Sequence, residues 1–161
     1  MAKGGAKWGK MGDLTPSTWT FHGHVQQTLD PKGRVTVPAR WRHEGLEILL
    51  ALPDDAQPSL RLMPTQVLNS LLARLEEDPT QSDDLKAEKL RFYSYRAFEC
   101  SLDKQGRLLL PSVYIEKLGL AGPVQLVGAF RHFEIWRPEV WQDHLVQLQT
   151  AHASGALRLN R

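Results

Sequence analysis

An internal repeat with a constant offset of 73 residues, as from Asp30 to Asp103, constrains this chain more than any other feature. Residues 28–38 read TLDPKGRVTVP, and residues 101–111 read SLDKQGRLLLP without a gap. Five of these positions are identical and three are conservative, so the repeat indicates a duplicated module. The identical pairs are Leu29 and Leu102, Asp30 and Asp103, Gly33 and Gly106, Arg34 and Arg107, and Pro38 and Pro111.

Each copy of the repeat reads as a strand, a tight turn and a second strand. The first strands are predicted at residues 25–29 and 98–102. Aspartate accepts backbone hydrogen bonds at the start of a turn, and glycine adopts positive φ near its end. The proline that closes each motif lacks a backbone donor, so it should end the second strand and begin a short helix. The residues expected to structure the two turns are Asp30, Gly33, Asp103 and Gly106.

The segments around the motifs predict further strands and helices. Apolar runs predict strands at residues 47–52, 60–63, 124–127 and 133–136. Helices are predicted at residues 112–118, after Pro64, after Pro138, and in a linker capped by Asp83 or Asp84. We therefore divide the chain into a flexible basic N-terminal tail (1–20), a first module (21–80), a linker helix (81–95), a second module (96–153) and a C-terminal tail (154–161).

Composition is typical of a globular protein, with 42% hydrophobic and 24% charged residues. No apolar run approaches the roughly 20 residues of a membrane helix, and the N-terminus lacks the apolar core of a secretory signal. These features predict a cytoplasmic protein with no membrane partner. The single cysteine, Cys100, cannot form an internal disulfide or a zinc site by itself, and we interpret it as a small strand residue.

Two Leu-Asp-x-x-Gly-Arg motifs, each followed by proline, resemble those of the MraZ family. The residues that carry the resemblance are Asp30, Gly33, Arg34 and Pro38, and Asp103, Gly106, Arg107 and Pro111. The segments FHGH at 21–24 and LVGAFRHFEIW at 126–136 also look like this family, so the resemblance spans roughly residues 21–150. The single module is similar to the AbrB and MazE group of DNA-binding proteins.

The resemblance implies both a fold and a function. The fold would be α+β, with two AbrB-like modules forming an internal pseudo-dimer whose β core is barrel-like and surrounded by helices. The function would be transcriptional regulation through double-stranded DNA, at short direct repeats upstream of the division and cell-wall gene cluster, including the protein's own gene. The resemblance also implies a homo-oligomeric ring of several subunits and association with the nucleoid.

The chemistry of the motifs fits nucleic-acid binding. Arginine offers a planar fork of donors for phosphate or for the O6 and N7 edge of guanine. The segment from Met1 to His43 carries a charge of +5, against +2 for the whole chain. We expect Arg34 to contribute more to DNA binding than Arg107. The candidate DNA-binding residues are Lys32, Arg34, Arg40, Arg42, Lys104 and Arg107.

Two other classes of function stay open at this point. An enzyme would need a catalytic motif, and neither a P-loop, a GxSxG elbow, a GxGxxG turn nor an HExxH helix occurs in the sequence, so we predict no catalytic residue, metal, cofactor or small-molecule substrate. His22 and His24 are the closest approach to a metal-ligand pair. An AbrB- or MazE-like antitoxin, or an oligomeric scaffold without DNA specificity, is the alternative to a regulator.

Overall fold

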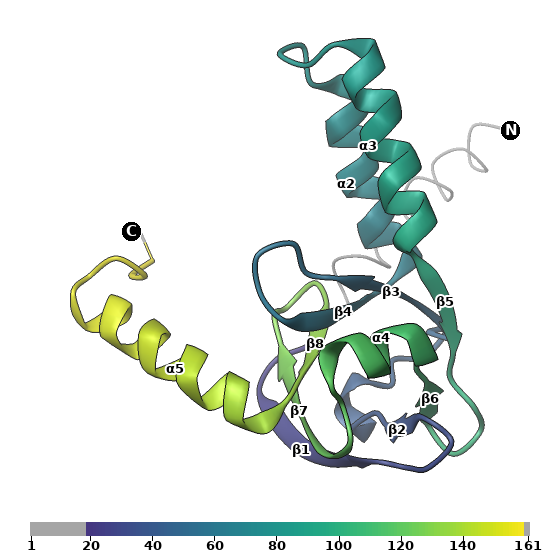
Figure 1. Cartoon of the computed structure of the whole chain (residues 1–161), viewed down its shortest axis with the longest axis vertical. Helices are drawn as coiled ribbons and strands as arrows, with labels where there is room; N and C mark the ends of the chain where they lie inside the picture. Colours follow the sequence, from purple (N-terminus) through teal and green to yellow (C-terminus); the bar gives the residue numbers. More distant parts are fainter. Residues whose placement is uncertain (1–18, 160–161) are drawn as a thin grey trace, which may run out of the picture.

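A computed structural model describes residues 19–159, so residues 1–18 of the expected N-terminal tail, including Trp8, lie outside the described part. The described chain is a mixed α+β structure (Figure 1). Its elements are β1 (His24–Leu29), β2 (Arg34–Thr36), η1 (Ala39–Trp41), β3 (Ile48–Pro53), β4 (Ser59–Met63), α2 (Thr65–Glu77), α3 (Asp83–Arg96), β5 (Phe98–Ser101), β6 (Arg107–Leu109), α4 (Ser112–Leu118), β7 (Gly122–Gly128), β8 (Phe133–Trp136) and α5 (Pro138–Ala153).

Local sequence signals explain most element boundaries. The predicted strands and helices are confirmed, and their ends agree to within a few residues. Gly119 adopts φ 64° at the end of α4, a left-handed cap that glycine forms without steric cost. The predicted cap of α3 is wrong, because the Ser82 hydroxyl accepts the Leu85 N–H at 3.2 Å. Asp83 and Asp84 instead occupy the first turn, where their charges favour the positive end of the helix dipole.

The strands of the two repeats are interleaved in one antiparallel sheet of order β1-β7-β8-β4-β3-β5. The first strand of each repeat pairs with the third strand of the other, β1 with β7 and β5 with β3. The fourth strands, β4 and β8, pair with each other at the middle of the sheet. This sheet is open, with β1 and β5 at its two edges, so the closed barrel that the resemblance implied is not what the pairing gives.

A second, two-stranded sheet joins β2 of the first repeat to β6 of the second. The strands are antiparallel, and Arg34 lies opposite Leu109, Val35 opposite Leu108, and Thr36 opposite Arg107. Because each strand follows one of the Asp-x-x-Gly-Arg motifs, the pairing places the two motifs in one structural unit. This small sheet lies at the lower end of the molecule in Figure 1, far along the long axis from the tip of α2 and α3.

Aromatic side chains form much of the core beneath the sheets. Trp41, Phe21 and Phe133 are fully buried, and their ring centroids lie 5.0–6.2 Å apart. Trp136 is also buried and packs edge-on against Trp141 of α5. Because Trp41, Trp136 and Trp141 are buried, they stabilise the fold and are not available to stack on bases.

The longer helices project from this β body (Figure 1). Helices α2 and α3 form a hairpin at one end, and α5 leaves in another direction. Neither α2 nor α3 contains a buried residue in the described chain, although Leu68, Leu71, Leu72 and Leu75 of α2 line one hollow with residues of β3 and α3. No helix within residues 19–159 has the length and apolar character needed to cross a lipid bilayer.

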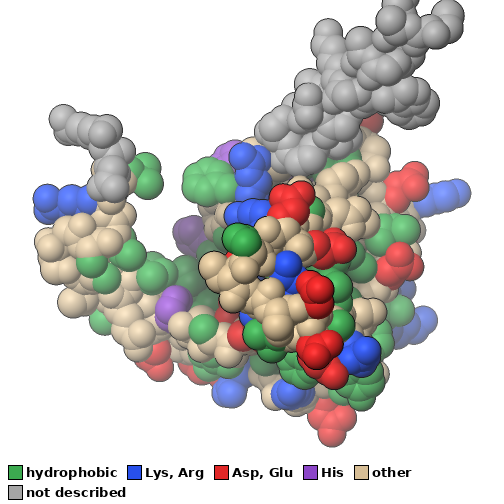
Figure 2. All heavy atoms as spheres, turned by 90° about the horizontal axis from the view of Figure 1, so that it is seen from above, with side chains coloured by type: hydrophobic (Ala, Val, Ile, Leu, Met, Phe, Trp, Pro, Cys, Tyr) green, Lys and Arg blue, Asp and Glu red, His purple; other side chains and the backbone are tan. Residues whose placement is uncertain are grey.

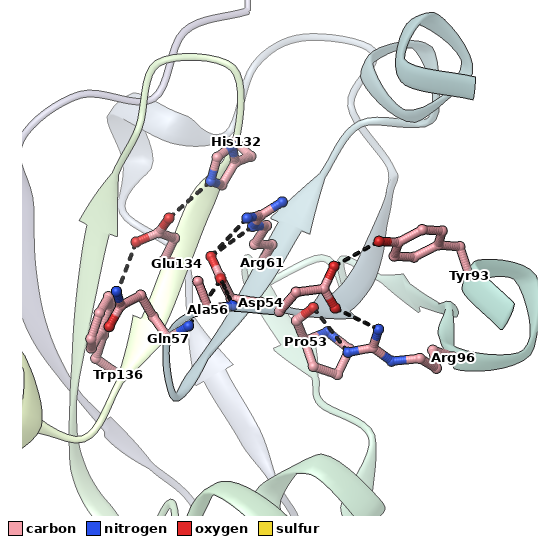
Figure 3. A network of polar contacts seen from close by, with 11 residues as sticks. Pro53, Asp54, Ala56, Gln57, Arg61, Tyr93, Arg96, His132, Glu134 and Trp136 are labelled. Atoms are coloured by element: carbon pink, nitrogen blue, oxygen red, sulfur yellow. Dashed lines mark hydrogen bonds and ion pairs between the residues drawn. The ribbon is translucent and has the colours of Figure 1, made fainter. Parts of the chain in front are cut away.

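A polar network fixes the loop between β3 and β4 to its neighbours (Figure 3). Arg61 donates two hydrogen bonds to Oδ2 of Asp54, at 3.0 and 2.8 Å. Asp55 accepts from the hydroxyl of Tyr93 and from Nη1 of Arg96, both at 2.7 Å. The loop therefore holds the end of α3 against the sheet, which sets where the helical hairpin leaves the body.

Candidate nucleic-acid interface

The first motif forms a tight turn, here called loop one (residues 30–34), between β1 and β2. Oδ1 of Asp30 accepts the backbone N–H groups of Lys32 and Arg34 at 2.9 and 2.8 Å, and Oδ2 accepts Nε of Arg34 at 2.7 Å. Gly33 adopts φ 84°, a conformation that side chains with a Cβ rarely take. The aspartate thus shapes the turn and orients the arginine through the same carboxylate.

The second motif repeats this geometry in loop two (residues 103–107), between β5 and β6. Asp103 accepts the N–H groups of Gln105 and Arg107 at 2.9 Å and Nε of Arg107 at 2.8 Å. Gly106 adopts φ 79°. Local residues therefore account for the hydrogen bonds within this turn, because two sequences that share only Asp, Gly and Arg in the loop reach the same pattern.

Backbone hydrogen bonds join each loop to the other repeat. The N–H of Leu110 donates to the carbonyl of Gly33, and the N–H of Val37 donates to the carbonyl of Gly106, both at 2.9 Å. These bonds extend the β2–β6 pairing at both ends. Each loop is consequently completed by a segment that belongs to the opposite copy.

Both loop aspartates are held in their ionised form. The pKa of Asp30 lies below its usual 3.8, chiefly because the backbone N–H of Arg34 donates a hydrogen bond to the carboxylate. Desolvation of the carboxylate raises the pKa but does not outweigh this effect. The pKa of Asp103 is lowered in the same way by the N–H and side chain of Arg107. At neutral pH both carboxylates are charged, so the ion pairs that orient the two arginines are intact.

The β2–β6 pair has one buried and one outward face. Val35 and Leu108 are almost fully buried on the inner face. Residues directly opposite one another share a face, and so do residues two apart along a strand. The outward face therefore carries two cross-strand pairs, Arg34 with Leu109 and Thr36 with Arg107. In such ladders diagonal neighbours lie about 7–8 Å apart, so the two arginines form a compact pair.

The guanidinium groups remain reachable from solvent. The side chains of Arg34 and Arg107 are 28% and 33% exposed to solvent. Each donates a hydrogen bond from Nε to the aspartate of its own loop. Among residues 19–159, their terminal Nη groups make no further hydrogen bond that would occupy them. Lys32 and Lys104, near the tips of the two loops, are exposed and add one cation to each loop.

The other two basic residues predicted for the site lie in different places. Arg42 packs its side chain over loop two, where a Cβ on Gly106 would lie 2.6 Å from Cδ of Arg42. Arg40 lies over the Trp41 ring, 5.3 Å from its centroid, and donates to the carbonyl of His24 at 3.4 Å. The structure thus brings Arg42 to a loop and holds Arg40 against the start of β1.

Sequence reasoning missed three residues that flank the loops, Thr36, Leu109 and Ile115. The Cδ1 atoms of Ile115 and Leu109 lie 2.9 and 3.9 Å from the Cβ position of Gly33. Strand alternation after each glycine could have marked Thr36 and Leu109 as outward-facing. No local signal places Ile115 beside loop one, because that contact is made between the two repeats.

Charge is separated along the molecule. Five acidic residues and no basic residue occur from Glu76 to Asp84, at the turn between α2 and α3. Figure 2 looks down on this end and shows acidic side chains gathered over the hairpin, with basic ones among them. The β2–β6 sheet lies at the opposite end in Figure 1. Such a separation favours approach to a polyanion with the β2–β6 end first.

The side chains of His132, Glu134 and Cys100 contribute to packing of the described chain. His132 Nε2 lies 3.0 Å from Oε2 of Glu134, whose Oε1 accepts Nε1 of Trp136 (Figure 3). Burial raises the pKa of Cys100 to about 11, so its thiol is protonated at neutral pH and packs as the predicted strand residue. Residues 19–159 contain no group of three potential metal ligands, and His22 and His24 form no such site there.

The chain is similar to curated proteins named "Transcriptional regulator MraZ". It is 36% identical to that of Desulfitobacterium hafniense, over 84% of this chain and 94% of the relative. The identities to those of Idiomarina loihiensis and Leuconostoc citreum are 31% and 35%, over 87% and 79% of this chain and 94% and 87% of the relatives. A family model described as "MraZ protein, putative antitoxin-like" matches residues 95–158. On this likeness over most of its length, the chain belongs to the MraZ family.

Proposed function

We propose that this protein is a sequence-specific, DNA-binding transcriptional regulator that inserts its β2–β6 sheet into the major groove. One observation carries the proposal: a two-stranded antiparallel ribbon presents Arg34 and Arg107 together on its outward face. The major groove admits a two-stranded β-ribbon, and arginine binds guanine O6 and N7 through two hydrogen bonds. The names of the relatives support the regulatory role.

The residues around the ribbon divide into reading and positioning roles. Arg34 and Arg107 contact base edges, because they lie on the face that enters the groove. Lys32, Lys104 and Arg42 contact phosphates on either side, which fixes register without reading sequence. Arg40 adds a phosphate contact only if its bond to the His24 carbonyl opens. Asp30 and Asp103 stay off the DNA and keep the turns in shape, since a carboxylate would repel phosphate.

The proposed targets are short direct repeats upstream of the division and cell-wall gene cluster, which includes the protein's own gene. A mobility shift with a duplex from upstream of that gene tests this, with an unrelated duplex of equal length as control. We expect the upstream duplex to bind at least ~10³-fold more tightly, which is the lower end of the usual range for specific over non-specific binding. With the three phosphate contacts assigned above, the log–log slope of affinity against salt should be about −3 for each bound chain. Equal binding of the two duplexes would contradict sequence-specific regulation.

We also propose that the two repeats act as an internal pseudo-dimer and that several chains assemble into a ring. The exchanged strand pairs support the internal pseudo-dimer, because the first strand of each repeat pairs with the third strand of the other repeat. Exposed apolar side chains on the projecting helices support the ring, because their burial between subunits would remove apolar surface from water. They include Leu71 on α2, Phe92 and Tyr95 on α3, and Val146 on α5.

A ring makes binding depend on the spacing of the DNA repeats. One chain offers few cations, so contact by neighbouring subunits should raise the effective concentration at each further repeat. We expect light scattering after size exclusion to give the mass of several chains. Inserting five base pairs between the repeats, about half a helical turn, should weaken binding at least tenfold. A lone monomer or dimer, or binding indifferent to spacing, would contradict the ring.

An antitoxin-like role is the second candidate, favoured by the description of the matching family model. An antitoxin neutralises its toxin through a segment outside the DNA-binding module, whereas here both motifs and their flanks lie in one ribbon.

The proposed regulator is a non-enzymatic, cytoplasmic protein associated with the nucleoid. Its folded part consists of the two modules, at residues 21–80 and 96–153, and the linker helix at 81–95.

A further inference from the structure

We infer that the two ends of the β2–β6 ribbon read different base chemistry, with Leu109 as the residue that recognises a thymine methyl group. The inference rests on the proposed DNA binding and specifies what each end of the same surface recognises. It follows from four positions of the ribbon and its flanks at which the two repeats differ in chemistry: Thr36 against Leu109, and Arg42 against Ile115.

The end of the ribbon at loop one is apolar. Leu109 lies opposite Arg34 on the outward face and is 55% exposed, whereas its strand neighbours Leu108 and Leu110 are buried. Its Cδ1 lies 3.9 Å from the Cβ position of Gly33, and Ile115 reaches the same glycine. A large apolar side chain beside a guanidinium on the binding face gains by contact with an apolar group of the ligand.

The end at loop two is polar and more basic. Thr36, the counterpart of Leu109, lies opposite Arg107 on the outward face. Arg42, the counterpart of Ile115, covers Gly106 with its side chain. This end therefore presents a hydroxyl and two guanidinium groups where the other end presents one guanidinium and two aliphatic side chains.

Base-pair edges in the major groove distinguish these two surfaces. Thymine is the standard base with a methyl group in that groove, and aliphatic side chains contact it. Hydroxyl and guanidinium groups fit the acceptors of guanine or the phosphates beside them. If both ends were equal, the ribbon would read a palindrome. Because they differ, the ribbon prefers a site with one thymine-containing half and one polar half, and binds it in a single orientation.

The experiment starts from a duplex library with a randomised segment of about 20 base pairs, enriched on the full-length protein. In the enriched duplex, each thymine is then replaced singly by uracil, which removes only the C5 methyl group. The wild-type chain is compared with Leu109→Ser, with the exchange variant Thr36→Leu/Leu109→Ser, and with Leu85→Ser, an exposed leucine on α3. Serine is used because the methyl group of threonine would itself contact a thymine methyl group. Circular dichroism checks that all four chains are folded.

The wild type should lose about fourfold in affinity at one or two uracil positions within one half of the site, equivalent to ~0.8 kcal/mol for one buried methyl group. Leu109→Ser should abolish this sensitivity, and Leu85→Ser should keep it. The exchange variant should move the sensitive position into the other half. An enriched duplex that tolerates uracil everywhere, or a Leu109→Ser chain with unchanged sensitivity, overturns the inference while DNA binding stands. Failure to enrich any duplex overturns both the inference and the proposed function.

Discussion

Replacing Arg34 and Arg107 together by alanine should weaken binding to the upstream duplex on the order of 100-fold, with no change in fold. Each bidentate contact to a base is worth ~1–3 kcal/mol, and the two residues occupy separate corners of the ribbon, so their losses should add. Arg34→Ala alone should cost more than Arg107→Ala, because Arg42 remains beside Gly106 of loop two, whereas the side chains nearest Gly33 of loop one are the aliphatic Ile115 and Leu109. A mobility-shift titration at fixed salt gives all three values.

The matched control is Arg91→Ala, which also removes one arginine. The Arg91 side chain is 68% exposed on α3 and pairs with Glu88, away from the ribbon. It should leave affinity within about twofold of wild type, because a solvated ion pair contributes little. If the double variant bound as tightly as the Arg91→Ala control, the ribbon would not be the DNA-binding surface.

Gly128→Ala should destabilise the protein by ~3 kcal/mol, at the upper end of the effects of overpacking. A Cβ at this position would meet the backbone carbonyl of Phe21 and lie 2.8 Å from Cα of His22. Neither backbone can move freely, because Phe21 and Phe130 exchange hydrogen bonds at 2.9 and 2.7 Å and Gly128 donates to Gly23 at 2.8 Å. For a chain of this size the loss corresponds to a fall in Tm of roughly 6–12 °C.

Gly122→Ala, at the other end of β7, separates close contact from backbone strain. Apart from its chain neighbours, no atom of residues 19–159 lies within 4 Å of its Cβ position, but its φ of 61° is unfavourable for alanine. This control should cost only ~1 kcal/mol. Thermal unfolding by circular dichroism compares the two variants, and equal falls in Tm would show that the contact with Phe21 is not what excludes a side chain at Gly128.

Local structure was predictable because each signal acts on residues close by in the chain. Asp30 binds backbone groups two and four residues later, and the second repeat does the same without sharing the intervening residues. The helix of residues 112–118 was predicted to the residue, since a proline and a glycine delimit it. The cap of α3 was misassigned because serine and aspartate are nearly equivalent caps, and the sequence holds both in succession.

Strand partners were not predictable in the same way. Period-two patterns indicate which face of a strand is buried, but they carry no information on which strand lies beside it. The exchange of first and third strands between repeats, and the open order of the large sheet, depend on packing of the whole chain. The resemblance suggested a barrel-like core, whereas the register of the strands defines two separate sheets.

The candidate site shows the same division. The repeat alone determined that there are two turns, that aspartate shapes each one, and that an arginine leaves each turn, because all of these interactions form within five consecutive residues. Only the tertiary structure decided that the two arginines share one face, that Arg42 and Ile115 cover opposite loops, and that Arg40 turns away toward β1. The physical reason is that each loop is completed by the other repeat, and a contact across some 70 residues of chain is fixed by packing rather than by local preference.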